Sequence, residues 1–186
     1  MLHFNLSKKM YETLSKANTD MTHNKPNNAW DWHAKIIKSG RVNCVIAVEE
    51  NTRYAIFLCD LKRADFKMFH YVFMDQFENH LVYLFGDAPV ETQKQIFELV
   101  LQLRDSSSYS TPMSNSVISH MTQMQHEIED FCHRELGGYL PATNHHLLSL
   151  GHRLNDNIRT HKNVDAEYIV PIREFKAKVL SLLENI

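Results

Sequence analysis

The stretch WDWHAKIIKSGRVNCVIAVEENTRYAIFLCD, residues 30–60, decides the fold of this chain. It contains three runs rich in apolar and β-branched residues, at residues 32–38, 42–48 and 54–59. Such composition favours strands. The runs are separated only by short polar segments, and short connections join antiparallel neighbours. The stretch therefore predicts a three-stranded antiparallel sheet.

The turns predict a register. With Ser39-Gly40 as a two-residue loop, Ile36 should lie opposite Asn43. With the second loop centred on residues 50 and 51, Val48 should lie opposite Arg53, and Asn51 can supply the left-handed position.

Side chains alternate along a strand, so this register sorts them onto two faces. The first face carries Trp32, Ala34, Ile36, Val45, Ala47, Tyr54, Ile56 and Leu58. The second carries His33, Lys35, Ile37, Val42, Cys44, Ile46, Val48, Ala55, Phe57 and Cys59. Because both faces are largely apolar, we expect helices on both, or a dimer contact over one. Trp32 is the expected anchor of the helix-packed face, and Trp30 is expected nearer the edge.

The rest of the chain reads mainly as helices. Residues 1–6 alternate like a fourth strand, and residues 105–116 suggest a loop or a brief edge strand around 109–113. Apolar residues at helical spacing predict helices at 8–17, 60–85, from 89 onward, 116–136, 144–159 and from 171 onward. In the last two, Ile158 and Leu180 are among the residues expected to face inward. The predicted fold class is α+β: a small antiparallel sheet of about four strands with about six helices. We expect a single domain, residues 1–186, with the sheet region in 1–60 and the helical region in 61–186.

Composition limits the classes of function. The chain has 186 residues and a net charge of −2, which disfavours a dedicated nucleic-acid binder. It has no secretory segment and no apolar run long enough to span a membrane, so we expect a soluble cytoplasmic protein. Cys44, Cys59 and Cys132 are odd in number and unclustered, as is typical of buried thiols in a reducing compartment. We expect Cys44 and Cys59 to share a sheet face as free thiols.

Two motifs resemble a known family. An N-terminal strand and helix, the WHA of residues 32–34, the hairpin at Arg41 and the strand ENTRYAIFL resemble an uncharacterised bacterial family, a domain of unknown function. The segment SNSVISHM, residues 114–121, resembles that family's later motif, with Asn115 in place of Arg and Ser119 in place of Gly. The resemblance spans most of the chain. It implies the fold and a bacterial source, and no activity.

A metal site is one chemical candidate. His126, Asp130 and His133 stand at i, i+4 and i+7 on the predicted 116–136 helix. Imidazole and carboxylate groups at one-turn spacing are ligands a divalent metal can use. The three residues lie opposite the apolar stripe of that helix, as His145 and His152 do on the next. The alternative is that both sets form solvated helix faces.

A ligand site at the start of the sheet is the second candidate. Trp32, His33 and Arg41, with Asp31 nearby, could bind a planar ligand or serve an enzyme or a nucleic-acid-processing protein. In the alternative, Trp32 belongs to the core and His33 satisfies its hydrogen bonds locally.

The sequence contains no nucleophile motif, no glycine-rich phosphate loop and no stand-out carboxylate pair. It leaves enzymatic activity undecided and predicts no cofactor. We therefore predict a non-enzymatic cytoplasmic domain that acts through a protein partner or through itself as a dimer. The alternatives are an enzyme with its site around Trp32, His33 and Arg41, and a metal-binding protein.

Overall fold

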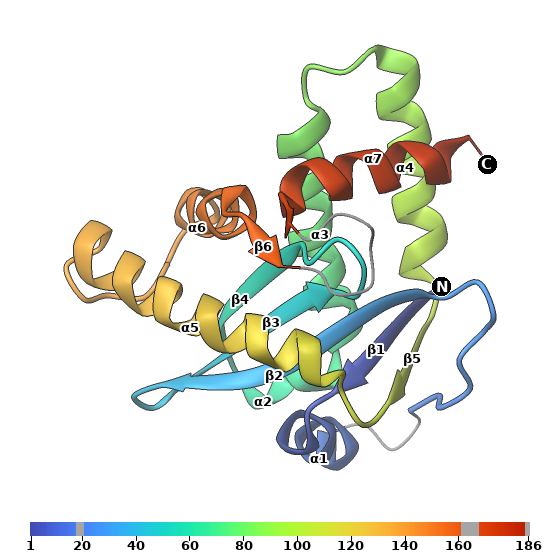
Figure 1. Cartoon of the computed structure of the whole chain (residues 1–186). Helices are drawn as coiled ribbons and strands as arrows, with labels where there is room; N and C mark the ends of the chain where they lie inside the picture. Colours follow the sequence, from blue (N-terminus) through green and yellow to red (C-terminus); the bar gives the residue numbers. More distant parts are fainter. Residues whose placement is uncertain (18–20, 161–167, 185–186) are drawn as a thin grey trace.

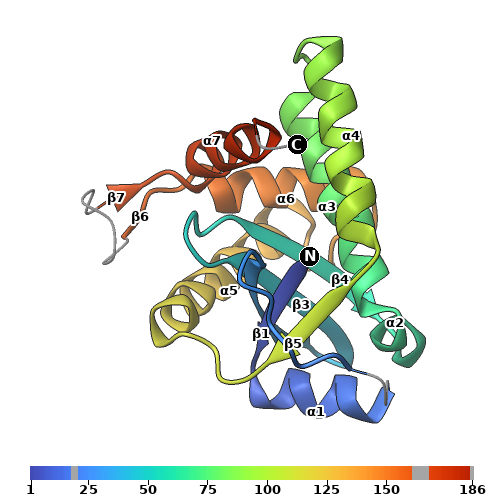
Figure 2. The same ribbon diagram turned by 90° about the vertical axis from the view of Figure 1, so that its right-hand side faces the viewer.

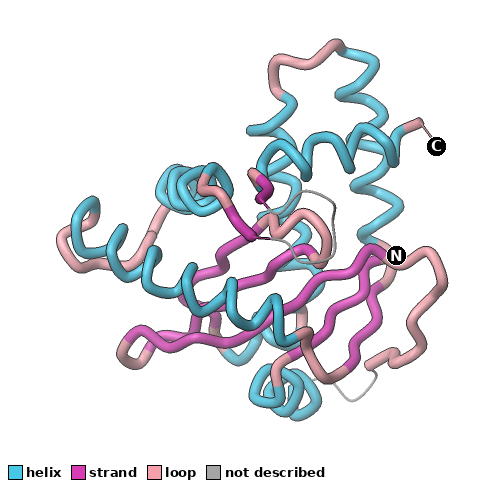
Figure 3. The backbone as a smooth tube through the Cα atoms, in the orientation of Figure 1, coloured by secondary structure: helices cyan, strands magenta, loops and turns pink. Residues whose placement is uncertain are grey.

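The α+β class is confirmed in the computed structural model, which describes residues 1–17, 21–160 and 168–184. One five-stranded sheet lies between helices (Figure 3, magenta), and two further short strands form a separate sheet. The strands are β1 (Leu2–Leu6), β2 (Trp30–Ser39), β3 (Val42–Glu49), β4 (Ala55–Leu61), β5 (Ser107–Ser110), β6 (Arg159–Thr160) and β7 (Tyr168–Ile169). The helices are α1 (Lys8–Ala17), α2 (Arg63–Lys67), α3 (Phe69–Phe85), α4 (Val90–Arg104), α5 (Asn115–Glu135), α6 (Asn144–Asp156) and α7 (Pro171–Leu183).

The large sheet is mixed, which corrects the prediction of about four antiparallel strands. Its order is β4-β3-β2-β1-β5, and β1 runs parallel to both β2 and β5. The crossover through α1 returns the chain to the end where β1 began, so β2 must run in the same direction as β1. The serine-rich segment does contain a brief edge strand, but β5 occupies Ser107–Ser110 rather than the expected 109–113, and it extends the sheet by one strand.

The hairpin register differs from the predicted one by two residues. Ile36 pairs with Val45 rather than Asn43, because the turn is Gly40-Arg41, with Gly40 at φ 59°. The second turn is longer than predicted, so Val48 pairs with Ala55, and the left-handed residue is Arg53 (φ 60°) rather than Asn51. A shift of two residues keeps every side chain on its side of the sheet, so the two predicted faces stand.

Helices cover both faces of the sheet (Figures 1 and 2). The first face packs with α1, α3, α4 and α7 in one buried cluster. The second face packs with α5 and α6 in another. Trp32 is fully buried on the first face, with its ring centroid 4.9 Å from that of Phe73. Trp30 is buried as well, stacked on Phe175 at 5.6 Å, because α7 covers the edge position expected to be open.

Several helix predictions need correction. The predicted 60–85 helix begins too early, because a bulge opposite Cys44 carries β4 on to Leu61 and Met68 separates α2 from α3. Ile158 lies past the end of α6, and Leu180 faces solvent on α7. In the part of the chain that the structure describes, no helix is long and apolar enough to cross a membrane.

Cys44 and Cys59, which were expected to share a sheet face as free thiols, lie on the neighbouring strands β3 and β4. Cys44 and Cys59 lie on the second face as expected, with their sulfur atoms 3.4 Å apart, and both are free, as is Cys132. Cys44 is buried, whereas Cys59 is only partly so.

Candidate functional site

The structure separates the three residues of the predicted ligand site. Trp32 points into the first-face core, whereas His33, its neighbour on β2, points to the second face. Arg41 is exposed in the turn at the far end of β2, eight residues from His33. Asp31 pairs with Lys25 at 2.7 Å. These residues therefore form no common pocket around Trp32, His33 and Arg41.

His33 is buried and engaged at both ring nitrogens. The backbone N–H of Ser114 donates to Nδ1 at 3.3 Å, so Nε2 carries the proton and donates to the Glu50 carboxylate. A histidine with both nitrogens occupied has none left to take a proton from a substrate. His33 instead links the N-terminal end of α5 to β2. This arrangement agrees with the alternative in which His33 satisfies its hydrogen bonds locally.

Glu49 and Arg53 extend this buried network around the β3–β4 turn. The Glu49 carboxylate is fully buried and accepts from the backbone and hydroxyl of Thr52, from the backbone of Asn51, and from Lys178 at 2.6 Å. The guanidinium of Arg53 donates to the Glu50 carbonyl and to the Ser116 hydroxyl. Burial lowers the pKa of Arg53, and Glu50 and Glu49 oppose that shift. Buried ionic groups require hydrogen bonds and charge partners of this kind. The network therefore stabilises the β3–β4 turn.

The histidine-rich face of α5 is exposed. His126 is 76% exposed and stands 3.6 Å from Glu129, and His133 is also exposed. Asp130 pairs with Arg134 and Arg153, each at 2.6 Å. Among residues 1–17, 21–160 and 168–184, no three His, Cys, Asp or Glu side chains are grouped so that they could hold a metal ion.

An apolar groove between α3 and α4 is the candidate functional site. The two helices are joined through Gly86, and their joined ends extend beyond the sheet (Figure 1, green). The groove has a volume of about 200 Å³. Its lining is Glu78, Leu81, Val82, Phe85, Gly86, Gln93, Ile96, Phe97 and Val100. The groove is open to solvent.

The groove exists because α4 is apolar on more than one side. Ile96, Leu99, Val100 and Leu103 are buried, as the sequence predicted. Phe97 and Leu101 lie one turn apart and remain 55% and 49% exposed, and Val82 on α3 is 65% exposed. A helix that is buried on a single face carries a narrower apolar stripe than α4 does. Large apolar side chains gathered on one outer surface mark sites of interaction.

The two helices that form the groove carry a net negative charge. Residues 69–104 hold five acidic and two basic side chains, a net charge of −3 against −2 for the whole chain. Arg104 is already held by Asp75 and Glu78, at 3.0 and 2.6 Å. Lys176 of α7 lies over the ring of Phe85 at 5.4 Å, at one side of the groove. An incoming surface would therefore meet apolar side chains on a pair of helices with a net negative charge, and Glu78 is the carboxylate in the groove lining.

Sequence reasoning missed this groove. The signal was present, since Phe97 and Leu101 lie one turn apart outside the inward stripe. Recognising them as exposed requires knowing which side of α4 the sheet and α7 cover, and spacing within one helix does not contain that information.

Comparison with protein families matches residues 3–174 to a family described as a domain of unknown function, DUF6933. No curated protein and no solved structure gives a significant match to the chain.

Proposed function

The chain belongs to this family, DUF6933, whose function is unknown, and we propose from its α3–α4 groove that it is a non-enzymatic domain that binds a protein partner. The observation that carries the proposal is the exposure of Val82 and Phe97 in the groove, with the exposed Leu101 one turn from Phe97 on α4. The full engagement of His33 argues in addition against an enzyme built on Trp32, His33 and Arg41.

The occupant that fits is an amphipathic helix with basic residues beside its apolar face. A groove between two helices receives a third helix through apolar anchors spaced one turn apart. The exposed Phe97 offers aromatic surface of the kind that dominates such interfaces. The net negative charge of the two helices favours Lys and Arg on the partner and speeds its association.

A second copy of this chain fits less well. Two α3–α4 grooves facing each other would bring together two segments that each carry a net charge of −3. Like charges placed across an interface oppose association. We therefore infer a partner of different sequence. The free cysteines and the family resemblance support a cytoplasmic setting in a bacterium.

Two synthetic peptides test the groove. Both are amphipathic helices of about 15 residues with the same leucine spacing. One carries Lys and the other Glu at every polar position. We expect the Lys peptide alone to bind, with an affinity that falls as salt is added.

Variants locate the binding surface. Val82→Asp combined with Phe97→Asp should weaken binding of the Lys peptide by about tenfold or more, because it removes apolar contact from the centre of the groove. The control is Tyr139→Asp with Ile158→Asp, two apolar positions outside the groove that are 79% and 68% exposed, somewhat more than Val82 and Phe97. Equal loss in both variants would reject the groove as the site. Light scattering that shows a dimer abolished by Phe97→Asp would replace the foreign partner with a second copy.

A further inference from the structure

Two cysteines lie side by side on neighbouring strands of the large sheet. The sulfur atoms of Cys44 on β3 and Cys59 on β4 are 3.4 Å apart, in hydrogen-bond contact. Both side chains belong to the second face of the sheet, so they point to the same side. A disulfide bond is about 2.05 Å long, so the two sulfur atoms need to approach each other by roughly 1.4 Å to form one.

The pairing of β3 with β4 is irregular at this position. It runs without interruption from Val48 to Val45, which pairs with Leu58, and then resumes with Asn43 opposite Leu61. Cys44 therefore stands opposite two residues, Cys59 and Asp60, as the single residue in a β-bulge does. Because a bulge disrupts the ladder of backbone hydrogen bonds, the two strands can shift here without breaking a regular pair.

The two cysteines differ in their access to solvent. β4 is an edge strand of the sheet (Figure 1), and Cys59 lies near its end, next to the exposed Asp60. Cys59 is partly exposed, whereas Cys44 is buried. A reagent in solution therefore meets Cys59 first, and Cys44 needs no access of its own because its sulfur is already against that of Cys59.

The contact between the two thiols also makes a thiolate available near neutral pH. The hydrogen bond from the Cys59 thiol lowers the pKa of Cys44 to about 7, and burial and the charge of Asp60 oppose that shift. The same contact raises the pKa of Cys59. The singly charged pair thus shares one proton. Movement of this proton to Cys44 leaves the thiolate, which is the nucleophilic form, on the partly exposed Cys59.

We infer that Cys44 and Cys59 form a reversible disulfide site that reacts with hydroperoxides, in which Cys59 meets the oxidant and Cys44 resolves the product. The Cys59 thiolate attacks one oxygen of hydrogen peroxide, the O–O bond breaks, and hydroxide leaves, which gives a sulfenic acid. The Cys44 sulfur then attacks the Cys59 sulfur, the S–O bond breaks, and a second hydroxide leaves. The two thiol protons convert both hydroxides to water, and two electrons pass from the sulfur pair to the peroxide.

The third cysteine provides an internal reference. Burial raises the pKa of Cys132, and the charges of Cys44 and Glu129 raise it further. It should therefore react more slowly than the pair. Transient disulfides in reducing compartments are typically redox-sensing or catalytic, so the site is compatible with a cytoplasmic setting. It does not depend on the α3–α4 groove, and either proposal can fail without the other.

Hydrogen peroxide added to the whole reduced chain tests the site. We expect the mass to fall by two hydrogen atoms, and peptide mapping to join the peptide that contains Cys44 to the one that contains Cys59. Cys132 should be oxidised at least about tenfold more slowly. Dithiothreitol should restore both thiols, since its own two thiols supply the electrons and protons.

Variants separate the roles of the two cysteines. Cys44→Ser removes the resolving sulfur, so the sulfenic acid should persist on Cys59 and be trapped by dimedone. Cys59→Ser leaves the buried Cys44, which should be trapped at least about tenfold more slowly. Cys132→Ser is the matched control and should form the disulfide at the rate of the unmodified chain. Circular dichroism checks that each variant is folded.

The mapping on the unmodified chain stands even if a variant fails to fold. The assignment would be overturned if peroxide that oxidises free cysteine left Cys44 and Cys59 reduced. A main product that joins either residue to Cys132 or to a second chain would overturn it as well. Faster trapping of Cys44 in Cys59→Ser than of Cys59 in Cys44→Ser would overturn the order of the two steps.

Discussion

Buried polar side chains hold the irregular parts of the molecule in place. Glu49 fixes the β3–β4 turn from inside it and joins that turn to α7 through Lys178. His33 joins β2 to the start of α5. Leaving such groups unpaired in the interior costs more than their pairing gains. These residues consequently determine where loops and helices meet, although they resemble catalytic groups in the sequence.

Two tryptophans test the first-face core. Trp32 is enclosed by Phe73 and Phe77, and Trp30 by Phe77 and Phe175. Trp32→Ala should lower the free energy of unfolding by about 3–5 kcal/mol, as truncations of large buried aromatic residues do. Trp30→Ala should approach that value, because it is buried too.

Urea unfolding of both variants measures these losses. A Trp32→Ala protein that unfolds like the unmodified chain would show that Trp32 is not part of the core. A small loss for Trp30→Ala alone would show that α7 does not cover the start of β2 in solution.

At the scale of elements, helix faces were predictable and strand direction was not. Met10 and Leu14 on α1, and the stripe from Val117 to Phe131 on α5, are buried as their spacing indicated. Alternation along β1 is the same whether its neighbour runs parallel or antiparallel, so the sequence pattern could not distinguish the two. The hairpin register depended on a choice between Ser39-Gly40 and Gly40-Arg41, and both contain the required glycine.

The contact between α3 and α6 depends on a glycine. A Cβ atom added to Gly151 would stand 2.5 Å from Cε1 of His80, whose Nδ1 is held by the Tyr54 hydroxyl at 2.8 Å. Alanine in place of glycine gains about 1 kcal/mol of helix propensity. Overpacking a fixed interior costs about 1–3 kcal/mol. The clash should outweigh the gain, so Gly151→Ala should be destabilising.

Thermal unfolding shows whether Gly151→Ala lowers or raises the stability of the fold. Ser149→Ala, on the exposed side of the same helix, is the control and should stay within about 0.5 kcal/mol. A higher melting temperature for Gly151→Ala than for the unmodified chain would mean that α3 and α6 lie farther apart than described here.

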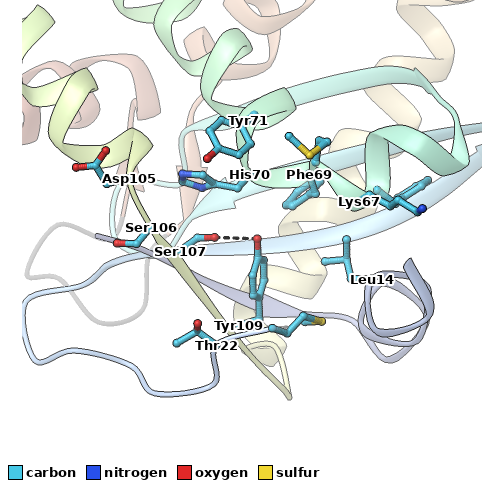
Figure 4. A pocket seen from close by; sticks show the side chains of 13 residues that line it. Leu14, Thr22, Lys67, Phe69, His70, Tyr71, Asp105, Ser106, Ser107 and Tyr109 are labelled. Atoms are coloured by element: carbon cyan, nitrogen blue, oxygen red, sulfur yellow. Dashed lines mark hydrogen bonds between the residues drawn. The ribbon is translucent and has the colours of Figure 1, made fainter. Parts of the chain in front are cut away.

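On the scale of the whole molecule, the α3–α4 groove and a polar cavity lie on the same pair of helices. The groove uses the outer surface of α3 and α4, and the cavity lies at the start of α3 and the end of α4 (Figure 4). Neither could be read from the sequence, because the lining of the cavity includes Leu14, Phe69 and Ser107, which are far apart in the chain. Spacing identifies residues that share a helix face, whereas these meet only after the sheet and helices have packed.

The buried histidines link stability of the whole fold to pH. Burial lowers the pKa of His80 to about 4, and burial is also the main cause of lower pKa values for His3 and His70. In the unfolded chain each titrates near 6.5. Between about pH 6.5 and 4 the unfolded chain therefore binds protons that the folded chain does not, and the free energy of unfolding falls as pH falls. The full contribution is present above about pH 6.5, and His80 alone accounts for about 3 kcal/mol of the loss by pH 4.

Urea unfolding at pH 7.5, 6, 5 and 4 measures this slope. His80→Gln keeps a polar side chain beside Tyr54 but does not titrate, so it should reduce the loss of stability between pH 6.5 and 4. His126→Gln, at an exposed position, should leave the slope unchanged. The remaining slope in His80→Gln is expected from His3 and His70. If the unmodified chain and His80→Gln lose stability in parallel, protonation of the buried imidazole beneath α6 does not control the acid sensitivity of this fold.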